Sequence, residues 1–229
     1  MSGCASQTGM WDRMRTSAVD AVKDPNVWVP LTGAALMMVD NVDNRIARDA
    51  ARNTKLFSDP QGSSNDLADA SAVLYLVTLI GDRDASLSAK ATRAGKDFVS
   101  LGSALALTEG LKDVTDRRRP QDNNTESFPS GHATRLGGLT YLTRRNLDDL
   151  DLAPGVQVGA RVAAYGLAAT GAWARVEAGK HHPSDVLFGY ALGHFTTEWV
   201  RRVFFRSDRL AVTYRPLEAG GAISVAMQF

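Results

Sequence analysis

The chain has 229 residues, of which 44% are apolar and 22% charged, and its formal net charge is +1. These values are ordinary for one globular domain with a substantial core. Such a balanced charge gives no general field for nucleic-acid binding. Apolar runs stop well short of the roughly 18 residues that a membrane span needs. The most apolar stretches, residues 73–80 and 162–174, are therefore expected to be buried helices of a soluble protein.

The single cysteine, Cys4, excludes an internal disulfide bond. The start Met1-Ser2-Gly3-Cys4 resembles the end of a bacterial lipoprotein signal, in which Cys4 would carry the lipid. The alternative is an ordinary free thiol on a frayed terminus. On the lipoprotein interpretation we expect a flexible N-terminus over residues 1–8, a place in the bacterial periplasm, and an anchor in the outer membrane.

The first half of the chain alternates helical patterns with polar loops. Apolar residues at helical spacing predict helices over residues 10–23, 27–39, 43–54, 67–80 and about 86–116. Ser, Asp, Pro, Gly and Asn crowd residues 57–66, which predicts a loop before the fourth of these helices. A second polar loop is predicted over residues 117–130.

The second half of the chain contains three further helical patterns and a different tail. Helices are predicted over residues 132–145, 156–174 and 184–205, with an acidic linker at 146–155. In the tail, apolar residues alternate on either side of a turn-like stretch at 216–221, which predicts a short β-hairpin. The hairpin either packs on the bundle or presents an edge to a membrane or partner. We thus expect an all-α fold: a single-domain helical bundle over residues 9–206 and a hairpin tail over 207–229.

Two polar segments carry residues suited to an anion. Lys112 and Arg119 are seven residues apart, nearly two helical turns, and Pro120 favours an Arg119 just beyond the helix end. Further on, Ser130 is a natural helix N-cap, and Gly131 lets a ligand approach the backbone closely. The N–H groups at such a helix start would point toward an anion.

A third segment places Arg175 upstream of His181 and Asp185. Pro183 is suited to the first helical position, so His181 would lie just before a helix and Asp185 in its first turn. An imidazole beside a carboxylate, near a helix N-terminus and a guanidinium, can hold an anion and attack it.

Together the three segments provide what phosphoryl transfer through a histidine requires. The non-bridging oxygens need fixed positive charge, phosphorus needs a nucleophile, and the leaving oxygen needs a proton; the three segments offer three cations and two histidines, His132 and His181. The set does not resemble a carboxylate cage for a metal, and its cations can stabilise the charge that Mg²⁺ stabilises elsewhere. We therefore expect no cofactor.

The three motifs resemble the signature of the type 2 phosphatidic acid phosphatase (PAP2) superfamily. This superfamily also includes bacterial class A acid phosphatases and vanadium-dependent haloperoxidases. The matching segments are Lys112-x6-Arg119-Pro120, Pro129-Ser130-Gly131-His132 and Arg175-x5-His181-x3-Asp185, which span about a third of the chain. One position departs from the pattern: Ala174 stands where the family usually has serine, which removes a hydrogen bond near the phosphate site.

The resemblance implies a role for each motif residue. His181 is the nucleophile that becomes phosphorylated, and Asp185 fixes its tautomer. His132 protonates the leaving alcohol and later activates water. The phosphate oxygens are held by Lys112, Arg119, Ser130, the backbone N–H of Gly131, and Arg175.

The expected function is a metal-independent phosphatase that hydrolyses a lipid phosphate or a small phosphate ester through a phosphohistidine. Two alternatives stay open: a vanadium haloperoxidase-like oxidoreductase with vanadate on His181, and a non-catalytic phosphate or phospholipid binder. No nucleic-acid partner is expected, and a membrane would be contacted only through Cys4.

Residues 57–66 and 117–128 are expected to set specificity. His182 and His194 are expected to be structural, and Arg117 and Arg118 either widen a positive entrance or are solvated.

Overall fold

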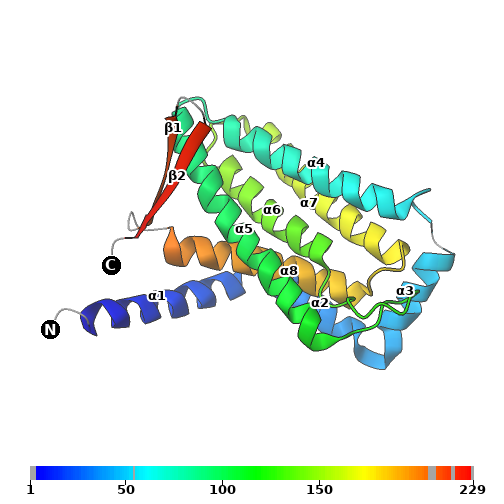
Figure 1. Ribbon diagram of the computed structural model, residues 1–229. Coiled ribbons are helices and arrows are strands. Elements are labelled where there is room, and N and C mark those ends of the chain that lie inside the picture. Colours follow the sequence, from blue (N-terminus) through cyan, green and yellow to red (C-terminus); the bar gives the residue numbers. More distant parts are fainter. Residues whose placement is uncertain (1–3, 54, 206–209, 218–219, 228–229) are drawn as a thin grey trace.

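The computed structural model describes residues 4–53, 55–205, 210–217 and 220–227, with side chains over 9–53 and 55–205. Within these ranges the chain is helical apart from a C-terminal pair of strands, so the predicted all-α fold is confirmed (Figure 1). The elements in chain order are α1 (Cys4–Lys23), α2 (Pro25–Met37), the 3₁₀ turn η1 (Val39–Asn41), α3 (Val42–Arg52), α4 (Pro60–Ile80), α5 (Leu87–Thr115), α6 (Gly131–Asp148), α7 (Pro154–Glu177), α8 (Pro183–Phe204), β1 (Leu210–Leu217) and β2 (Gly220–Met227).

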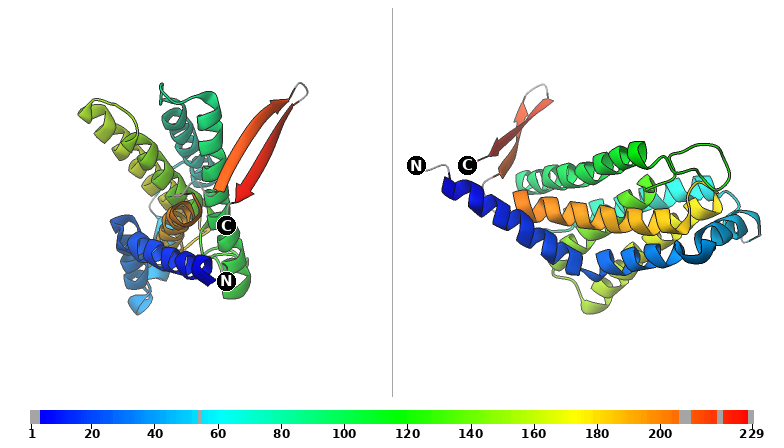
Figure 2. Two further views of the ribbon diagram at one scale, coloured as in Figure 1. Left: turned by 90° about the vertical axis from the view of Figure 1, so that its left-hand side faces the viewer. Right: turned by 90° about the horizontal axis from the view of Figure 1, so that it is seen from below.

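Helix α8 is the centre of the bundle. It packs against α1, α2, α5, α6 and α7, and the end-on view in Figure 2 shows it surrounded by other helices. Residues on all sides of α8 are accordingly buried, including Val186, Ala191 and Val203. A helix that is buried all round needs partners on every face. Helix α4 completes the arrangement on the far side, where it packs on α6 and α7.

Glycines let α6 and α8 come unusually close. A Cβ atom on Gly193 would lie 2.0 Å from the Thr134 carbonyl oxygen, and one on Gly137 would lie 2.1 Å from the Tyr190 carbonyl oxygen. No side chain fits at such distances, so the two backbones touch where other residue types would hold them apart. This contact brings the starts of α6 and α8 together, and Ser130 N donates to the Asp185 carbonyl at 3.1 Å.

Helix α4 corrects the loop that we predicted over residues 57–66. The helix begins at Pro60, seven residues before the predicted start, because Asp59 caps it by accepting from Gly62 N at 3.0 Å. Proline is favourable at the first helical position, where its missing N–H costs nothing. The polar residues of this stretch therefore lie on two ordered helical turns, not on a loop.

The two ends of the chain extend the predicted pattern. Helix α1 begins at Cys4, six residues before the predicted start at Met10, while residues 1–3 and the Cys4 side chain lie outside what the structure describes. The prediction about lipidation therefore stays a prediction. Strands β1 and β2 pair antiparallel with Tyr214 opposite Ile223, and β1 lies beside α5 (Figure 1). The turn residues 218–219 and the expected domain boundary at 206–207 fall outside the described residues.

None of the described helices is both long enough and apolar enough to cross a membrane.

Candidate active site

The predicted motif residues meet at one end of the bundle, where the ends of five helices converge. Helices α5 and α7 end there, and α4, α6 and α8 begin there (Figure 1). Two contacts show the convergence: Arg175 on α7 donates to Gln61 on α4 at 2.8 Å, and His132 on α6 lies 2.8 Å from Asn65 on α4. The site is therefore built from helix termini, with α4 as one wall.

The His181 ring is buried and held by the backbone. Its Nδ1 lies 2.6 Å from the Ser127 carbonyl oxygen, and the residue is 3% exposed. A carbonyl oxygen can only accept, so Nδ1 carries the proton and Nε2 carries a lone pair. No hydrogen bond is made by Nε2 among the described residues. The nitrogen that a nucleophile needs is thus free.

Burial keeps His181 uncharged. Burial lowers the pKa of the ring to about 3. The hydrogen bond to Ser127 acts in the opposite direction, whereas the positive charges of Arg175, Arg119 and Lys112 lower the pKa further. The imidazole is therefore neutral throughout the physiological pH range, as nucleophilic attack requires.

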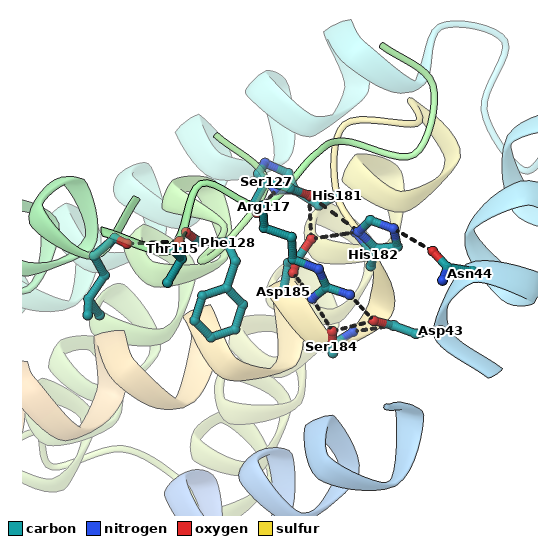
Figure 3. A network of polar contacts seen from close by, with 11 residues as sticks. Asp43, Asn44, Thr115, Arg117, Ser127, Phe128, His181, His182, Ser184 and Asp185 are labelled. Atoms are coloured by element: carbon teal, nitrogen blue, oxygen red, sulfur yellow. Dashed lines mark hydrogen bonds and ion pairs between the residues drawn. The ribbon is translucent and has the colours of Figure 1, made fainter. Parts of the chain in front are cut away.

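Asp185 does not occupy the place that we predicted. We expected its carboxylate to hold His181, but His181 Nδ1 is taken by the Ser127 carbonyl. Asp185 Oδ2 instead accepts from Ser127 Oγ at 2.6 Å and from His182 N at 2.7 Å (Figure 3). The carboxylate is a cap in the first turn of α8, where the backbone N–H groups favour a negative charge. It supports His181 indirectly, by fixing the residue whose carbonyl holds the ring.

Arg117 links Asp185 to the N-terminal part of the chain. Its guanidinium pairs with the Asp185 carboxylate, donates to Asp43 Oδ2 at 2.6 Å, and donates to Ser184 Oγ at 2.7 Å (Figure 3). Asp43, on α3, is buried and also accepts from Ser184 N at 2.9 Å. One guanidinium thus neutralises two buried carboxylates, which would be costly without it.

His182 belongs to the same network. Its Nε2 lies 2.9 Å from Asn44 Oδ1, and its Nδ1 lies 3.2 Å from Asp185 Oδ2 (Figure 3). The ring therefore joins the start of α8 to α3, which agrees with the structural role that we predicted for it.

The three motif cations surround the two catalytic candidates. Lys112 lies in the last turn of α5, with Nζ 2.8 Å from Glu109 Oε1, and Arg119 lies in the loop beyond α5. Burial lowers the pKa of Arg175 to about 10, and the positive charge of Arg119 contributes to this decrease. The Nε atoms of Arg119 and Arg175 are both buried and have no hydrogen-bond partner among the described residues. Unpaired buried donors of this kind cost about 1–3 kcal/mol each, so the site is built for additional acceptor oxygens.

His132 is half-buried at the start of α6. Its Nε2 lies 2.8 Å from Asn65 Oδ1, which as an amide oxygen can only accept, so Nε2 carries a proton. Burial, followed by the charges of Arg175, Arg135 and Lys112, lowers the pKa of His132 to about 4. The ring is therefore neutral at physiological pH, with three cationic side chains nearby.

The N-terminus of α6 faces the same space. Ser130 is fully buried and caps the helix, with Oγ 3.4 Å from Ala133 N. A Cβ atom on Gly131 would lie 3.6 Å from Lys112 Nζ, so the first residue of the helix lies directly beside that cation. Helix N–H groups and an ammonium group together suit an oxyanion.

Several residues of the site were not predicted from the sequence. Gln61, Ser64, Asn65 and Ser127 lie in the two stretches expected to set specificity, whereas Asp43 and Asn44 carried no expectation. An Asp-Asn pair at the start of a charged helix has no distinctive spacing, and no sequence signal singles it out. Ser127 lies two residues before Pro129, the start of the second motif, and could have been considered on that ground.

The donors of the site suit an anion more than a metal ion. The site consists of arginine, lysine and neutral histidine side chains with backbone N–H groups, and the carboxylates of Asp43 and Asp185 are already paired with Arg117. Within the described part of the chain, the one group of three His, Cys, Asp or Glu side chains close enough to share an ion lies elsewhere, at Asp24, His194 and Glu198.

Comparison with known proteins agrees with this geometry. The family model described as the PAP2 superfamily matches residues 95–209, half of the chain, which include all three motifs. The chain belongs to the PAP2 superfamily. Its fold is similar to the crystal structure of a transmembrane PAP2-type phosphatidylglycerolphosphate phosphatase from Bacillus subtilis, with a TM-score of 0.59 and 20% sequence identity. That match covers 81% of this chain and 94% of the other. No curated protein matches the chain.

Membership of the PAP2 superfamily indicates a phosphatase. The segment that matches the family begins within α5, so α3 and α4 lie outside it, although both contribute side chains to the site.

Proposed function

We propose that the protein hydrolyses phosphate monoesters at this site by transferring the phosphoryl group to Nε2 of His181. The observation that carries the proposal is the pairing of a free imidazole Nε2 with two arginines, the half-buried Arg119 and the buried Arg175, whose buried Nε–H groups lack partners among the described residues. A phosphoryl group supplies the acceptor oxygens for the arginines and an electrophile for the imidazole.

In the first step, Nε2 attacks phosphorus as the ester P–O bond breaks. The lone pair of Nε2 forms the N–P bond, and the departing oxygen takes the proton of His132. The positive charge that develops on the His181 ring is shared with the Nδ1–H that donates to the Ser127 carbonyl. Lys112, Arg119 and Arg175 hold the three non-bridging oxygens in place.

The charge of the substrate prepares His132 for this role. The pKa of His132 is about 4, because burial and neighbouring cations oppose its protonation. A bound phosphate dianion offsets those cations and raises this pKa, so that the ring is protonated when the substrate is bound.

In the second step, water releases the phosphoryl group. His132, now neutral, takes a proton from the attacking water, the N–P bond breaks, and its electron pair returns to Nε2 of His181. Inorganic phosphate then leaves, the pKa of His132 falls back to about 4, and the ring releases its proton to solvent.

An exposed apolar side chain near the site favours a substrate with an apolar part. Leu56, whose N–H donates to Glu177, two residues after Arg175 on α7, is 72% exposed. Exposed apolar groups next to a phosphate site fit the acyl chains of a lipid phosphate. A small phosphate ester would use the same cations without this contact.

The test is phosphate release from dioctanoyl phosphatidate and from p-nitrophenyl phosphate, with EDTA present, for wild type and His181→Ala. We expect EDTA-resistant release, faster from phosphatidate, and a loss of about 10³-fold or more in His181→Ala. We also expect an acid-labile phosphoryl adduct on the wild-type chain and none on the variant.

Three results would overturn the proposal. The first is full activity in a folded His181→Ala protein, and the second is release that EDTA abolishes in wild type. The third is halide oxidation with vanadate and peroxide in place of phosphate release, because the same cations could hold vanadate.

A further inference from the structure

A second group of ionisable side chains lies away from the motif residues, where the α1–α2 junction passes the later turns of α8. Asp24, His194 and Glu198 each direct one ligand atom toward a common point, and these atoms lie within 4.8 Å of one another. His194 Nε2 is 3.4 Å from Asp24 Oδ2 and 4.0 Å from Glu198 Oε2.

These side chains are incompletely satisfied. His194 is fully buried, and neither ring nitrogen has a hydrogen-bond partner among the described residues. Glu198 is 2% exposed; its Oε1 accepts from Arg202 Nε at 2.7 Å, whereas its Oε2 has no hydrogen-bond partner in the described chain. Leaving such atoms unpaired costs about 1–3 kcal/mol each, so a further ligand is expected at this point.

Asp24 has one oxygen to offer. Its Oδ1 caps α2 by accepting from Asn26 N at 2.8 Å, which leaves Oδ2 facing His194. Asp24 Oδ2 is therefore the carboxylate oxygen that can bind a ligand shared with His194.

The three ligand atoms, which lie within 4.8 Å of one another, must move closer together to bind a small metal ion. A tetrahedral ion with bonds of about 2.0–2.1 Å holds its ligand atoms about 3.3 Å apart. Asp24 and Glu198 also line a cavity of about 390 Å³, through which an ion can enter and from which water can supply a fourth ligand.

Neighbouring arginines oppose a cation here. Arg144 lies 3.6 Å from Asp24 Oδ2, and Arg145, Arg201 and Arg202 line the same cavity. An ion must displace Arg144 from Asp24, while Arg202 keeps its contact with the other oxygen of Glu198. We therefore expect a dissociation constant on the order of micromolar, weaker than that of closed structural zinc sites.

We propose that Asp24, His194 and Glu198 bind a divalent transition-metal ion such as Zn²⁺. One imidazole and two carboxylates suit zinc better than they suit Mg²⁺ or Ca²⁺, which prefer oxygen ligands alone. The ion ties the α1–α2 junction to α8. His194 lies nine residues beyond Asp185, about 14 Å along the helix axis, so the ion stabilises the fold and takes no part in the phosphate site.

Asp24→Asn is the informative variant, because asparagine caps a helix as well as aspartate does but is a poor metal ligand. Zinc binding to the metal-stripped full chain is measured by calorimetry, together with the melting temperature with and without zinc. We expect wild type to bind one more equivalent than Asp24→Asn and to gain melting temperature that the variant does not gain. Glu198→Gln is expected to behave like Asp24→Asn.

Asp148→Asn is the matched control, since Asp148 lines the same cavity but is not one of the three ligands. It should bind zinc as wild type does. Equal zinc stoichiometry in wild type and a folded Asp24→Asn protein would overturn the proposal, because the zinc would then be held by the other histidines. A His194 ring that titrates as an imidazolium and takes up no zinc would overturn it as well.

Discussion

At the scale of single residues, two histidines are kept neutral by different surroundings. His181 is enclosed and donates to a carbonyl, whereas His132 is half-buried and surrounded by cations. The first arrangement suits a group that must attack, and the second suits a group whose proton affinity has to rise when an anion arrives.

The depressed pKa of His181 makes stability depend on pH. The folded value is about 3, against about 6.5 in an unfolded chain. Stability from this residue is thus fully present above pH 6.5 and is lost as pH falls toward 3. Between pH 7 and pH 5 the loss is about 2 kcal/mol. In His181→Asn the amide can still donate to the Ser127 carbonyl but does not titrate. This loss of about 2 kcal/mol in the free energy of unfolding should therefore be absent from the variant.

Urea unfolding at pH 7 and pH 5 measures this difference. The wild-type protein should lose more free energy of unfolding than His181→Asn over the same interval. Identical losses would mean that His181 is not held neutral in the folded state.

At the scale of elements, the loop between α5 and α6 illustrates how adjacent residues of one type can differ. Arg117 pairs with the buried carboxylates of Asp43 and Asp185, whereas Arg118 is exposed and makes no hydrogen bond or ion pair with the described residues. The sequence Arg117-Arg118-Arg119 offers no means of telling them apart.

Removing Arg117 should therefore destabilise the protein. Arg117→Ala leaves two buried carboxylates without their cation, and we expect a loss of about 3 kcal/mol in the free energy of unfolding. Arg117→Lys should recover only part of it, because an ammonium cannot bridge two carboxylates as a guanidinium does. Arg118→Ala should change stability by no more than about 0.5 kcal/mol. Equal effects of Arg117→Ala and Arg118→Ala would contradict the network.

The contact between α6 and α8 gives a second prediction at this scale. In Gly193→Ala the new Cβ would overlap the Thr134 carbonyl, 2.0 Å away, and the helices must separate. We expect a loss of about 3 kcal/mol or more and weaker phosphate binding, because the starts of both helices move apart.

Gly166→Ala on α7 is the matched substitution. A Cβ there meets nothing within 4 Å, so it should stabilise the helix by up to about 1 kcal/mol. Thermal unfolding compares the two variants. A Gly193→Ala protein as stable as Gly166→Ala would show that the close contact is not needed.

At the scale of the whole molecule, the sequence predicted most of the helices because their apolar periodicity is strong. It misplaced the start of α4, where polar residues at 60–66 resemble a loop but follow the capping pair Asp59-Pro60. Local composition cannot distinguish a solvated loop from a helical start whose polar side chains face a site.

The predicted site residues were those with recognisable spacing, and the structure brings them to one end of the bundle. The residues that support them were not predictable in the same way. Asp43 contacts Ser184 across 141 positions, and Gln61 contacts Arg175 across 114. Contacts between residues so far apart in the sequence depend on how the whole chain folds, which a single sequence does not reveal.

The role of the Ser127 carbonyl limits what mutagenesis can detect at this site. The group that orients the His181 ring belongs to the main chain, so no substitution at residue 127 deletes it. Alanine scanning would report instead on Asp185 and Arg117, the side chains that hold the loop in place. The hydrogen bond that orients the nucleophile would thus not be detected by side-chain substitutions. Only a change in backbone chemistry, such as an ester or thioamide at position 127, would test it directly.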